Sequence, residues 1–256
     1  MTTWRVSPTP RMSEVGDVTD LVVITGASSG LGAALATTIP FPAHVVDVSR
    51  SGPKSDIDHI TADLSDPTQW THVGAEISRL VSQHNPARAV LIHNAGTLTP
   101  IGFAGEVEDL AYQANVLLNS AAGQALGHHF LKAVSGRPGR HELVMITSGA
   151  ATSPYAGWSA YGAGKAALNQ WVRNVGLEQR DRGGVIVAAI APGVVDTSMQ
   201  AEIRETSGGD FPTVGRFHEL HSEGHLVSPV DAAQRIWNLI ESGIEGGSVL
   251  ELRQRS

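Results

Sequence analysis

The sequence predicts an α/β fold of the doubly wound type, a parallel sheet of about seven strands with helices on both faces, in a single domain. Two observations carry this prediction. Short apolar runs of the kind that form strands buried on both faces alternate with segments of helical period. The first apolar run also leads straight into a glycine-rich turn and an alanine-rich helix. Because crossover connections are right-handed, the pattern predicts a Rossmann arrangement that binds its ligand at the carboxyl ends of the strands.

The strands are expected where the apolar runs lie, beginning with the continuous run 21–24. The later runs are at 44–48, 56–60, 89–93, 143–147, 185–190 and 248–252. After the helix that follows the first turn, apolar residues near a 3.6-residue spacing predict helices at 67–84, 109–134, 159–180 and 229–241. The alternation continues to the end of the chain, so one domain over 19–256 is expected.

Residues 1–18 form a polar segment that contains Pro8 and Pro10. We expect this leader to be poorly ordered and to lie outside the domain. It includes a second methionine, and the sequence alone does not decide whether Met1 or Met12 is the true start.

Composition limits the functions that the chain can have. Its 256 residues carry a formal net charge of −7 and include no cysteine. The charge argues against nucleic acid or an anionic membrane as a partner, and the apolar runs are too short to span a bilayer. Without cysteine there is no thiolate site, and the histidines show no zinc pattern, so no metal is expected. With no signal peptide in the sequence, a cytoplasmic protein is expected.

The glycine-rich turn has the composition of a dinucleotide-binding site. Gly26, Gly30 and Gly32 stand between the first strand and its helix. Glycine lets the backbone approach a pyrophosphate closely, and the helix N-terminus offers N–H donors and a favourable dipole. A plain βα turn is the alternative, but the position between an apolar strand and a helix favours binding.

The end of the second strand decides between NAD and NADP, because an acidic residue there binds the ribose hydroxyls whereas an arginine accommodates a 2′-phosphate. The chain has both Asp47 and the pair Ser49-Arg50. Arg50 stands about twenty residues after Gly30, where the discriminating group is expected. Asp47 is expected to lie inside the strand and to end short of the ribose. The sequence therefore predicts NADP(H) rather than NAD(H), with a solvated surface charge as the alternative role of Arg50.

Tyr161 and Lys165 are four residues apart in the predicted helix 159–180, so their side chains share one face. A free tyrosine has a pKa near ~10, too high for efficient proton exchange at neutral pH. A lysine ammonium ~5 Å away favours the phenolate by roughly 3 kcal/mol at an effective dielectric of ~20, which lowers that pKa to about 8. Ser148, at the end of the fifth predicted strand, is expected to hydrogen-bond a substrate carbonyl and hold it against the tyrosine. Helix packing for Tyr161 and a solvated face for Lys165 are the alternatives.

These residues occur in an order and spacing that resemble the short-chain dehydrogenase/reductase family. The resemblance covers residues 21–200 and rests on Thr25-Gly26-Ala27-Ser28-Ser29-Gly30-Leu31-Gly32, Asp63-Leu64, Asn94-Ala95-Gly96, Asn115, Ser148, Tyr161-x-x-x-Lys165 and Pro192-Gly193 with Thr197. Together with Ser49 and Arg50, the expected cofactor contacts are Gly26, Ser28, Ser29, Gly30, Leu31, Gly32, Asp63, Leu64, Asn94, Ala95, Gly96, Tyr161, Lys165, Pro192, Gly193, Val195 and Thr197.

The resemblance implies individual roles. Asp63 and Leu64 would flank the adenine, and 194–197 would meet the nicotinamide carboxamide. Asn115 would hold a water in a proton relay to Lys165; without the resemblance it is a helix-surface amide. The stretch 191–200, with 203–206 after it, looks like the sepiapterin reductase and benzil reductase branch of the family.

The substrate is less constrained by the sequence than the cofactor. The segment 198–227 is expected to act as a lid that shapes the pocket. The predicted pocket residues are Ser148, Tyr155, Trp158, Tyr161 and Met199, with Phe211 as a further apolar candidate. For the apolar members, packing in the core or lid is an equal alternative. The C-terminal stretch 250–253 offers only Glu251 in place of the aspartate that holds the pterin in sepiapterin reductase, so a diketone or another activated carbonyl fits as well.

The predicted function is an NADPH-dependent carbonyl reductase that transfers hydride to a ketone or diketone, with Tyr161 as general acid/base. One alternative is a 3-oxoacyl or hydroxysteroid-type enzyme of the same fold. The other is a non-catalytic NADP-sensing regulator, which is expected to lack Tyr161, Lys165 or Ser148; the chain has all three. By resemblance, the alanine-rich helices 109–134 and 159–180 are expected to form the interface of a homodimer or homotetramer.

Overall fold

The computed structural model describes residues 20–53 and 55–252. They form a seven-stranded parallel sheet in the order β3-β2-β1-β4-β5-β6-β7. The strands are β1 (Asp20–Thr25), β2 (Ala43–Ser49), β3 (Asp58–Thr61), β4 (Arg88–His93), β5 (Arg140–Ile146), β6 (Ile186–Ala191) and β7 (Val249–Glu251). The predicted fold class is therefore confirmed. The predicted leader, 1–18, lies outside the described residues.

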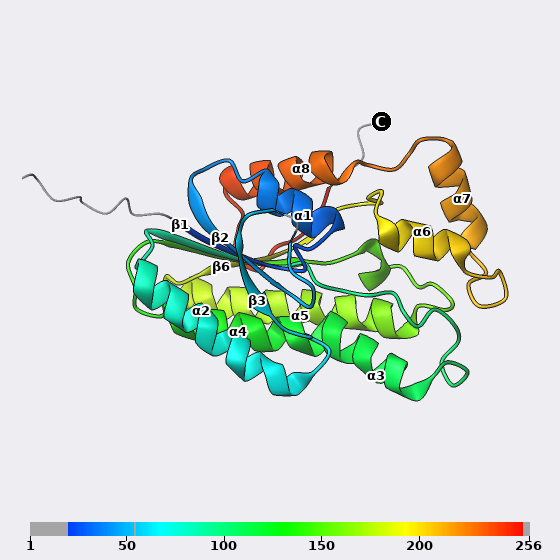
Figure 1. Cartoon of the computed structure of the whole chain (residues 1–256), viewed down its shortest axis with the longest axis horizontal. Coiled ribbons are helices and arrows are strands. Elements are labelled where there is room, and N and C mark those ends of the chain that lie inside the picture. Colours follow the sequence, from blue (N-terminus) through cyan, green and yellow to red (C-terminus); the bar gives the residue numbers. More distant parts are fainter. Residues whose placement is uncertain (1–19, 54, 253–256) are drawn as a thin grey trace, which may run out of the picture.

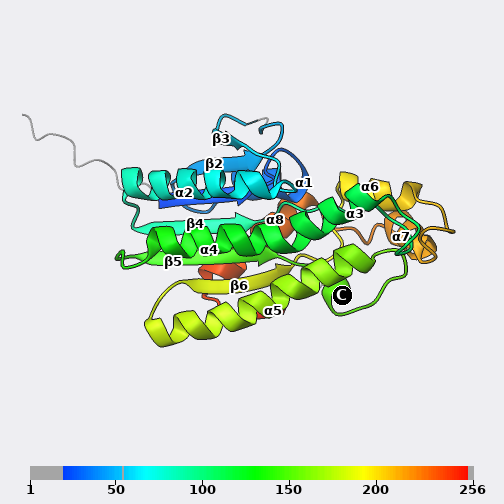
Figure 2. The same cartoon turned by 90° about the horizontal axis from the view of Figure 1, so that it is seen from below.

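Helices cover both faces of the sheet (Figure 1). On one face α1 (Gly30–Thr37) packs beside α8 (Pro229–Glu241), and on the other face α2 (Trp70–His84), α4 (Gly123–Val134) and α5 (Ser159–Arg182) lie side by side (Figure 2). Each layer buries its own apolar cluster against the sheet. Across the described ranges, the helices are all too short or too polar to traverse a lipid bilayer.

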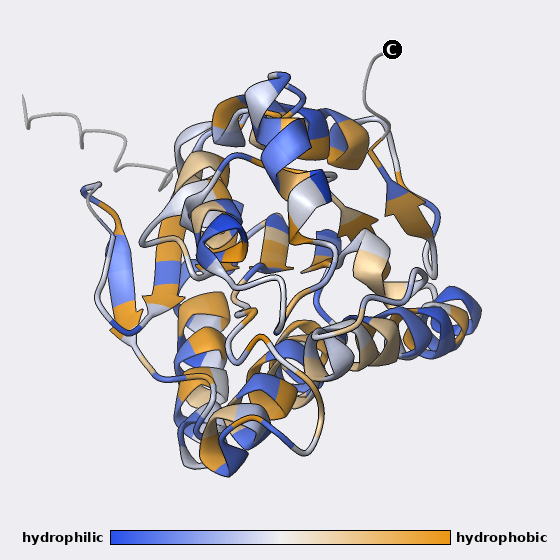
Figure 3. Cartoon of the chain, turned by 90° about the vertical axis from the view of Figure 1, so that its right-hand side faces the viewer, coloured by the Kyte–Doolittle hydropathy of each residue, from blue (hydrophilic) through white to orange (hydrophobic). Residues whose placement is uncertain are grey.

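The carboxyl ends of the strands meet along one edge of the sheet. From β1 the chain proceeds outward to β2 and β3, and it then returns to build β4 to β7 on the other side of β1. The boundary between β1 and β4 is thus the switch point at which doubly wound folds bind ligands. Figure 3 views the molecule from this carboxyl side.

The predicted helix 109–134 is not a single α-helix. It consists of α3 (Asp109–Val116), a π-helical segment (Leu117–Ala122) and α4. Glu108 caps α3 by accepting hydrogen bonds from the backbone N–H groups of Leu110 and Ala111. π-helical turns are rare in proteins, and those that occur are frequently at functional sites.

The segment predicted as a lid forms two short helices, α6 (Ser198–Glu205) and α7 (Val214–Ser222). Both lie beyond the carboxyl ends of the strands (Figure 1). Phe211, between them, is fully buried and stacks on Trp158 at a centroid distance of 4.5 Å. An apolar cluster separate from the two sheet layers therefore holds this segment against the start of α5.

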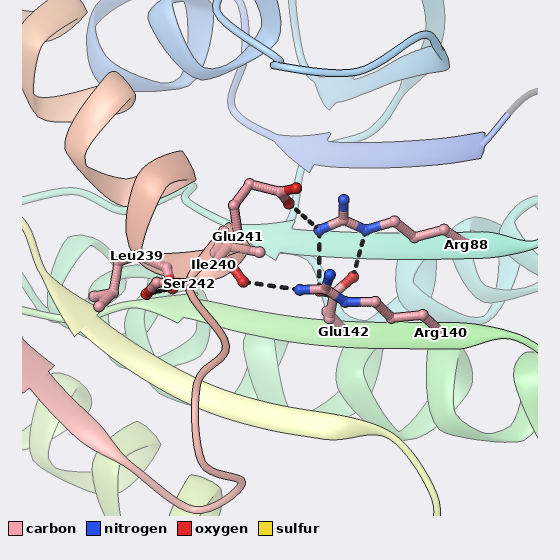
Figure 4. A network of polar contacts seen from close by, with 7 residues as sticks. All are labelled: Arg88, Arg140, Glu142, Leu239, Ile240, Glu241 and Ser242. Carbon is pink, nitrogen blue, oxygen red and sulfur yellow. Dashed lines mark hydrogen bonds and ion pairs between the residues drawn. The ribbon is translucent and has the colours of Figure 1, made fainter.

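At the opposite, amino-terminal edge, charged side chains brace β4 and β5 (Figure 4). Arg88 donates two hydrogen bonds to the buried carboxylate of Glu142, at 2.8 and 3.0 Å, and also contacts Glu241 at 2.6 Å. Arg140 contacts Glu142 at 2.6 Å and donates to the backbone carbonyl of Ile240 at 2.8 Å. The network fixes the last turn of α8 to the sheet.

Candidate active site

The glycine-rich turn has a backbone that side chains would obstruct. Gly26 and Gly30 have φ of +73° and +55°, in the left-handed region that favours glycine. A Cβ on Gly32 would lie 2.1 Å from the carbonyl oxygen of Gly26, so no larger residue fits there. Ser29 precedes α1 without a side-chain cap, which leaves the first N–H groups of the helix available. This turn fits the pyrophosphate of a dinucleotide.

Predicted cofactor contacts from distant parts of the chain lie around this turn. The Asn94 side chain donates to the carbonyls of Thr25 and Gly26, at 3.2 and 3.3 Å. The Thr25 hydroxyl in turn accepts hydrogen bonds from the N–H groups of Asn94 and Ala95. A Cβ on Gly30 would lie 3.3 Å from the Thr197 side chain. Strands β1, β4 and the segment after β6 thus converge on one place.

The other predicted contacts are spread along the same edge of the sheet. The carboxylate of Asp63 accepts hydrogen bonds from the backbone and hydroxyl of Ser65, and Leu64 is buried. Ser28 and Ser29 belong to the turn, whereas Leu31 points into the core. Pro192, Gly193 and Val195 follow β6, and Val195 pairs with Val227 in an isolated bridge. Their contacts with a cofactor stay predictions.

Asp47 lies inside β2, as the sequence predicted, and its side chain is fully buried. Its carboxylate accepts hydrogen bonds from the Ala27 backbone N–H at 2.6 Å, the Ser49 hydroxyl at 2.5 Å and His59 at 3.0 Å. These donors occupy both oxygens, so the carboxylate is not free to bind ribose hydroxyls. Arg50, in contrast, is exposed just after the strand. The Ser49 hydroxyl donates to Asp47, and its contact with the cofactor stays a prediction.

Ser148, Tyr161 and Lys165 come together at the carboxyl end of β5. Ser148 stands two residues beyond the strand, where it caps a short 3-10 helix by accepting from the N–H of Ala150. Its hydroxyl also forms a hydrogen bond with Tyr161. The Lys165 ammonium lies 5.8 Å from the centre of the Tyr161 ring and donates to the carbonyl of Ile146 at 2.9 Å. The predicted arrangement of these three side chains is therefore present.

The prediction that Lys165 lowers the pKa of Tyr161 is wrong for the chain by itself. Burial raises the pKa of the Tyr161 hydroxyl above its ordinary value, and the hydrogen bond with Ser148 opposes this only in part. The tyrosine is 8% exposed and packs edge-on against Trp158. Burial also lowers the pKa of Lys165 from 10.5 to about 8. Desolvation thus disfavours charge on both groups.

Asn119, rather than Asn115, lies beside Lys165. A Cβ on Gly96 would lie 2.8 Å from Asn119 Oδ1 and 3.4 Å from Lys165 Nζ, which places both side chains against the same glycine. Asn119 sits in the π-helical segment, and its amide donates to Asn115 Oδ1 at 2.9 Å. The Asn115 side-chain amide donates to the backbone carbonyls of Thr97, Leu98 and Thr99, at 3.3, 3.2 and 2.9 Å. These hydrogen bonds fix the loop after β4.

His93, at the end of β4, is a further buried group near the site. One ring nitrogen lies 3.1 Å from the Thr25 hydroxyl. Since that hydroxyl accepts from two backbone N–H groups, its own proton points to the histidine, which is therefore an acceptor at Nδ1. Burial, and next the charge of Lys165, lower the pKa of His93 to about 3. His93 is a neutral packing residue. No metal site is recognisable among the carboxylates and imidazoles of 20–53 and 55–252.

The predicted pocket residues do not all line one cavity. A cavity of 340 Å³ between the segment 150–155 and α5 is lined by Tyr155 and Trp158 among others. Ser148, Tyr161 and Met199 do not line it. The Tyr155 hydroxyl accepts a hydrogen bond from Arg216 of α7 at 3.0 Å, and Phe211 is core rather than lining. Contact of these residues with substrate stays a prediction.

Comparison with known proteins is consistent with this geometry. A family model described as short chain dehydrogenase matches residues 20–208. The chain is 37% identical to benzil reductase ((S)-benzoin forming) of Bacillus subtilis strain 168, over 92% of this chain and 99% of that enzyme. It is 32% identical to sepiapterin reductase of Rattus norvegicus, over 86% of this chain and 90% of the enzyme. The crystal structure of the KRED1-Pglu enzyme superposes with a TM-score of 0.77 and 29% identity, covering 90% of this chain and 100% of that one.

Proposed function

The chain belongs to the short-chain dehydrogenase/reductase family, and from this premise we propose that it is an NADPH-dependent carbonyl reductase acting on a ketone or diketone. The observation that carries the proposal is the meeting of Tyr161, Ser148 and Lys165 with the glycine-rich turn at one edge of the sheet. A nicotinamide bound there, in its reduced form, would supply the hydride. The protein residues then have to orient the carbonyl and deliver a proton.

Tyr161 is the proton donor in this proposal. Its pKa is raised by burial, so the hydroxyl keeps its proton at neutral pH and can give it to the carbonyl oxygen as negative charge develops. Ser148 is in reach to hydrogen-bond the same oxygen, because it already bonds Tyr161. Lys165 stabilises the resulting phenolate at short range. Replenishment of the proton would run through Lys165 and Asn119, in the role that the resemblance assigned to Asn115.

Two considerations support a diketone as the substrate class. The B. subtilis enzyme, which forms (S)-benzoin by its name, is matched over 99% of its length, more completely than the rat sepiapterin reductase. Aromatic side chains also gather beside Tyr161. The ring centre of Trp158 lies 5.7 Å from that of Tyr161, and the ring centre of Tyr155 lies 4.9 Å from that of Trp158. Such a surface suits a planar apolar carbonyl compound.

A panel of substrates tests the proposed function. Purified protein and NADPH are mixed with benzil and other diketones, sepiapterin, 3-oxoacyl esters and a 3-ketosteroid, and NADPH oxidation is followed at 340 nm as is usual for this cofactor. We expect turnover of diketones to exceed that of the others. Preferred turnover of an oxoacyl ester or ketosteroid would support the alternative enzyme, and NADPH binding without turnover of any carbonyl would support the regulator.

Exchange of Arg50 for aspartate tests the cofactor assignment. A charge-assisted hydrogen bond to phosphate contributes roughly 1.5–3 kcal/mol, or about ten- to a hundredfold in affinity. The Arg50→Asp variant is therefore expected to lose at least that factor in the ratio of kcat/KM for NADPH to that for NADH. Arg79→Asp, an exposed arginine on α2 paired with Glu76, is the control. An unchanged ratio in the Arg50 variant would refute the assignment.

We also propose that α3, α4 and α5 form the interface of a homodimer or homotetramer. Large apolar side chains are exposed on these helices: Leu110 at 72% and Val116 at 40% on α3, and Leu177 at 58% on α5. Replacing Leu110 and Leu177 together with glutamate is expected to shift the protein to a smaller species in multi-angle light scattering. Wild-type protein that is a monomer at micromolar concentration would contradict the proposal.

A further inference from the structure

We propose that Asp47 is a positioning residue for the cofactor: through one buried carboxylate it holds the glycine-rich turn and the loop that carries Arg50 in a fixed relation. We call Ala27, Asp47, Ser49 and His59 the Asp47 clamp. The inference rests on the proposed binding of NADP(H), and it assigns cofactor selectivity partly to Asp47 and His59, for which no contact with the dinucleotide is predicted.

The first arm of the clamp reaches the glycine-rich turn. Oδ1 of Asp47 accepts a hydrogen bond from the backbone N–H of Ala27 at 2.6 Å. Ala27 immediately follows Gly26, whose own N–H donates to the carbonyl of Val48 in β2. A charged acceptor on a short hydrogen bond is a strong restraint. This arm therefore fixes the part of the turn that would meet the pyrophosphate, a group that NADH and NADPH share.

The second arm reaches the loop after β2. Oδ2 of Asp47 accepts from the Ser49 hydroxyl at 2.5 Å and from Nδ1 of His59 at 3.0 Å. The Ser49 oxygen in turn accepts from the backbone N–H of Gly52 at 3.2 Å, which closes the loop 49–52 around Arg50. Gly52 has a φ of +75°, and a Cβ there would lie 3.4 Å from the His59 ring. This arm fixes the loop that would meet the 2′-phosphate, which only NADPH has.

His59 stabilises the buried carboxylate of Asp47 from the neighbouring strand β3. A carboxylate only accepts hydrogen bonds, so Nδ1 of His59 carries the proton, and Nε2 faces the Thr61 hydroxyl at 3.1 Å. In the described part of the chain, His59 is the one basic side chain in ion-pair contact with Asp47. A fully buried carboxylate is costly without hydrogen-bond donors, and His59 supplies one of the three that Asp47 has. His59 is thus the member of the clamp that can be changed without touching β1, β2 or the turn.

The test measures the dissociation constants of NADPH and NADH for the wild type and three variants, by quenching of tryptophan fluorescence. His59→Leu breaks the second arm. We expect it to weaken NADPH binding at least tenfold, to change NADH binding less than threefold, and to raise KM for NADPH while kcat at saturating NADPH stays within threefold. His59→Asn places an amide N–H where Nδ1 was, so both constants are expected to return to within threefold of wild type.

His44→Leu is the matched control. His44 lies in β2 and pairs with an aspartate of β3, Asp58 at 3.1 Å, whereas His59 lies in β3 and pairs with an aspartate of β2. The His44 side chain is 26% exposed, against 23% for His59. His44 stands near the start of β2, away from the loop that follows the strand, so neither dissociation constant is expected to change. Circular dichroism and thermal melting report whether each variant folds. If His59→Leu does not fold, His59→Ala breaks the same arm and is expected to show the same loss of NADPH selectivity.

Each outcome decides the proposal. A folded His59→Leu or His59→Ala protein that keeps the wild-type ratio of the two constants, or that loses both cofactors equally, overturns the clamp while the proposed function stands. Wild-type protein that binds neither dinucleotide overturns the proposed function and the clamp together. Loss of NADPH selectivity in His59→Leu with recovery in His59→Asn supports the clamp, since a merely structural role would not discriminate between the two cofactors.

Discussion

Exchange of Tyr161 for phenylalanine is expected to lower kcat for carbonyl reduction by about 10²- to 10⁴-fold, the contribution of a positioned general acid. The change removes one hydroxyl and leaves the ring in its apolar cluster with Trp158 and Phe211. The free energy of unfolding should therefore change little. Steady-state kinetics with the preferred carbonyl of the panel, together with a urea titration of both proteins, measure the two quantities separately.

Tyr112→Phe is the matched control for that experiment. The Tyr112 hydroxyl bonds the Ser159 side chain at 3.2 Å, at the start of the same helix α5, but it does not lie beside Ser148. Its loss should leave kcat within about threefold, because no proton transfer depends on it. A Tyr161→Phe protein with wild-type kcat would refute the assignment of the acid.

Exchange of Lys165 for methionine is the second change with a large expected effect, a loss of about 10²-fold or more in kcat. Methionine has a similar length but carries no charge, so it can neither stabilise the phenolate nor pass a proton. The pH profile adds a separate test. The pKa of Lys165 in the folded chain is about 8, so kcat of the wild type is expected to fall as the pH rises through that value.

The free energy of unfolding is expected to rise over the same pH range in which kcat falls. Between about pH 8 and the ordinary lysine pKa of 10.5, the unfolded chain binds the proton that the folded chain has released. Unfolding then becomes less favourable with rising pH, by up to roughly 1.4 kcal/mol per pH unit. Above about pH 10 the raised pKa of Tyr161 acts against this gain. Urea titrations of the protein alone, at pH 7 and pH 9, should show the rise in the wild type and not in Lys165→Met.

Lys132→Met, in the neighbouring helix α4, controls for general loss of a lysine. A Lys165→Met protein whose stability rises with pH as steeply as the wild type would show that another group titrates. A wild-type kcat that increases from pH 7 to pH 9 would contradict the need for an ammonium at this position.

The sequence was sufficient for the strands and for most helices, because burial on one or both faces leaves a period that can be read directly. The helix predicted at 229–241 has those same bounds in the structure, where Ser228 caps it and Pro229 begins it. The π-helical segment 117–122 was not predictable in this way. A segment of six residues is too short to show a period of its own, so it could not be told apart from the α-helices on either side.

The choice between Asn115 and Asn119 depended on that segment. The two residues are four positions apart and share a face of the helix, so helical periodicity alone does not show which of them lies beside Lys165. Only the position of Gly96 and Gly164 against Asn119 separates them, and those glycines lie on other elements. The sequence contained the right helix and the right residue type, but the contact that selects one residue is tertiary.

The prediction of a lowered pKa for Tyr161 was wrong for a related reason. That Tyr161 and Lys165 share one face follows from helix geometry, and the ammonium lies 5.8 Å from the centre of the tyrosine ring. The burial of Tyr161 depends on Trp158 and on Phe211, and Phe211 comes fifty residues after Tyr161 in the chain. Because desolvation is set by such distant neighbours, its effect on the pKa of Tyr161 could not be derived from local spacing.

The brace of Arg88, Arg140, Glu142 and Glu241 stands at the amino ends of the strands, whereas the proposed chemistry is at their carboxyl ends. A strand of six residues such as β4 spans about 20 Å, well beyond the reach of a side-chain contact. Changes in α6, α7 and the loop that holds Trp158 therefore leave the brace intact. If these segments shape the substrate pocket as proposed, substitutions there can alter substrate preference while the ion pairs at the opposite edge continue to hold the sheet together.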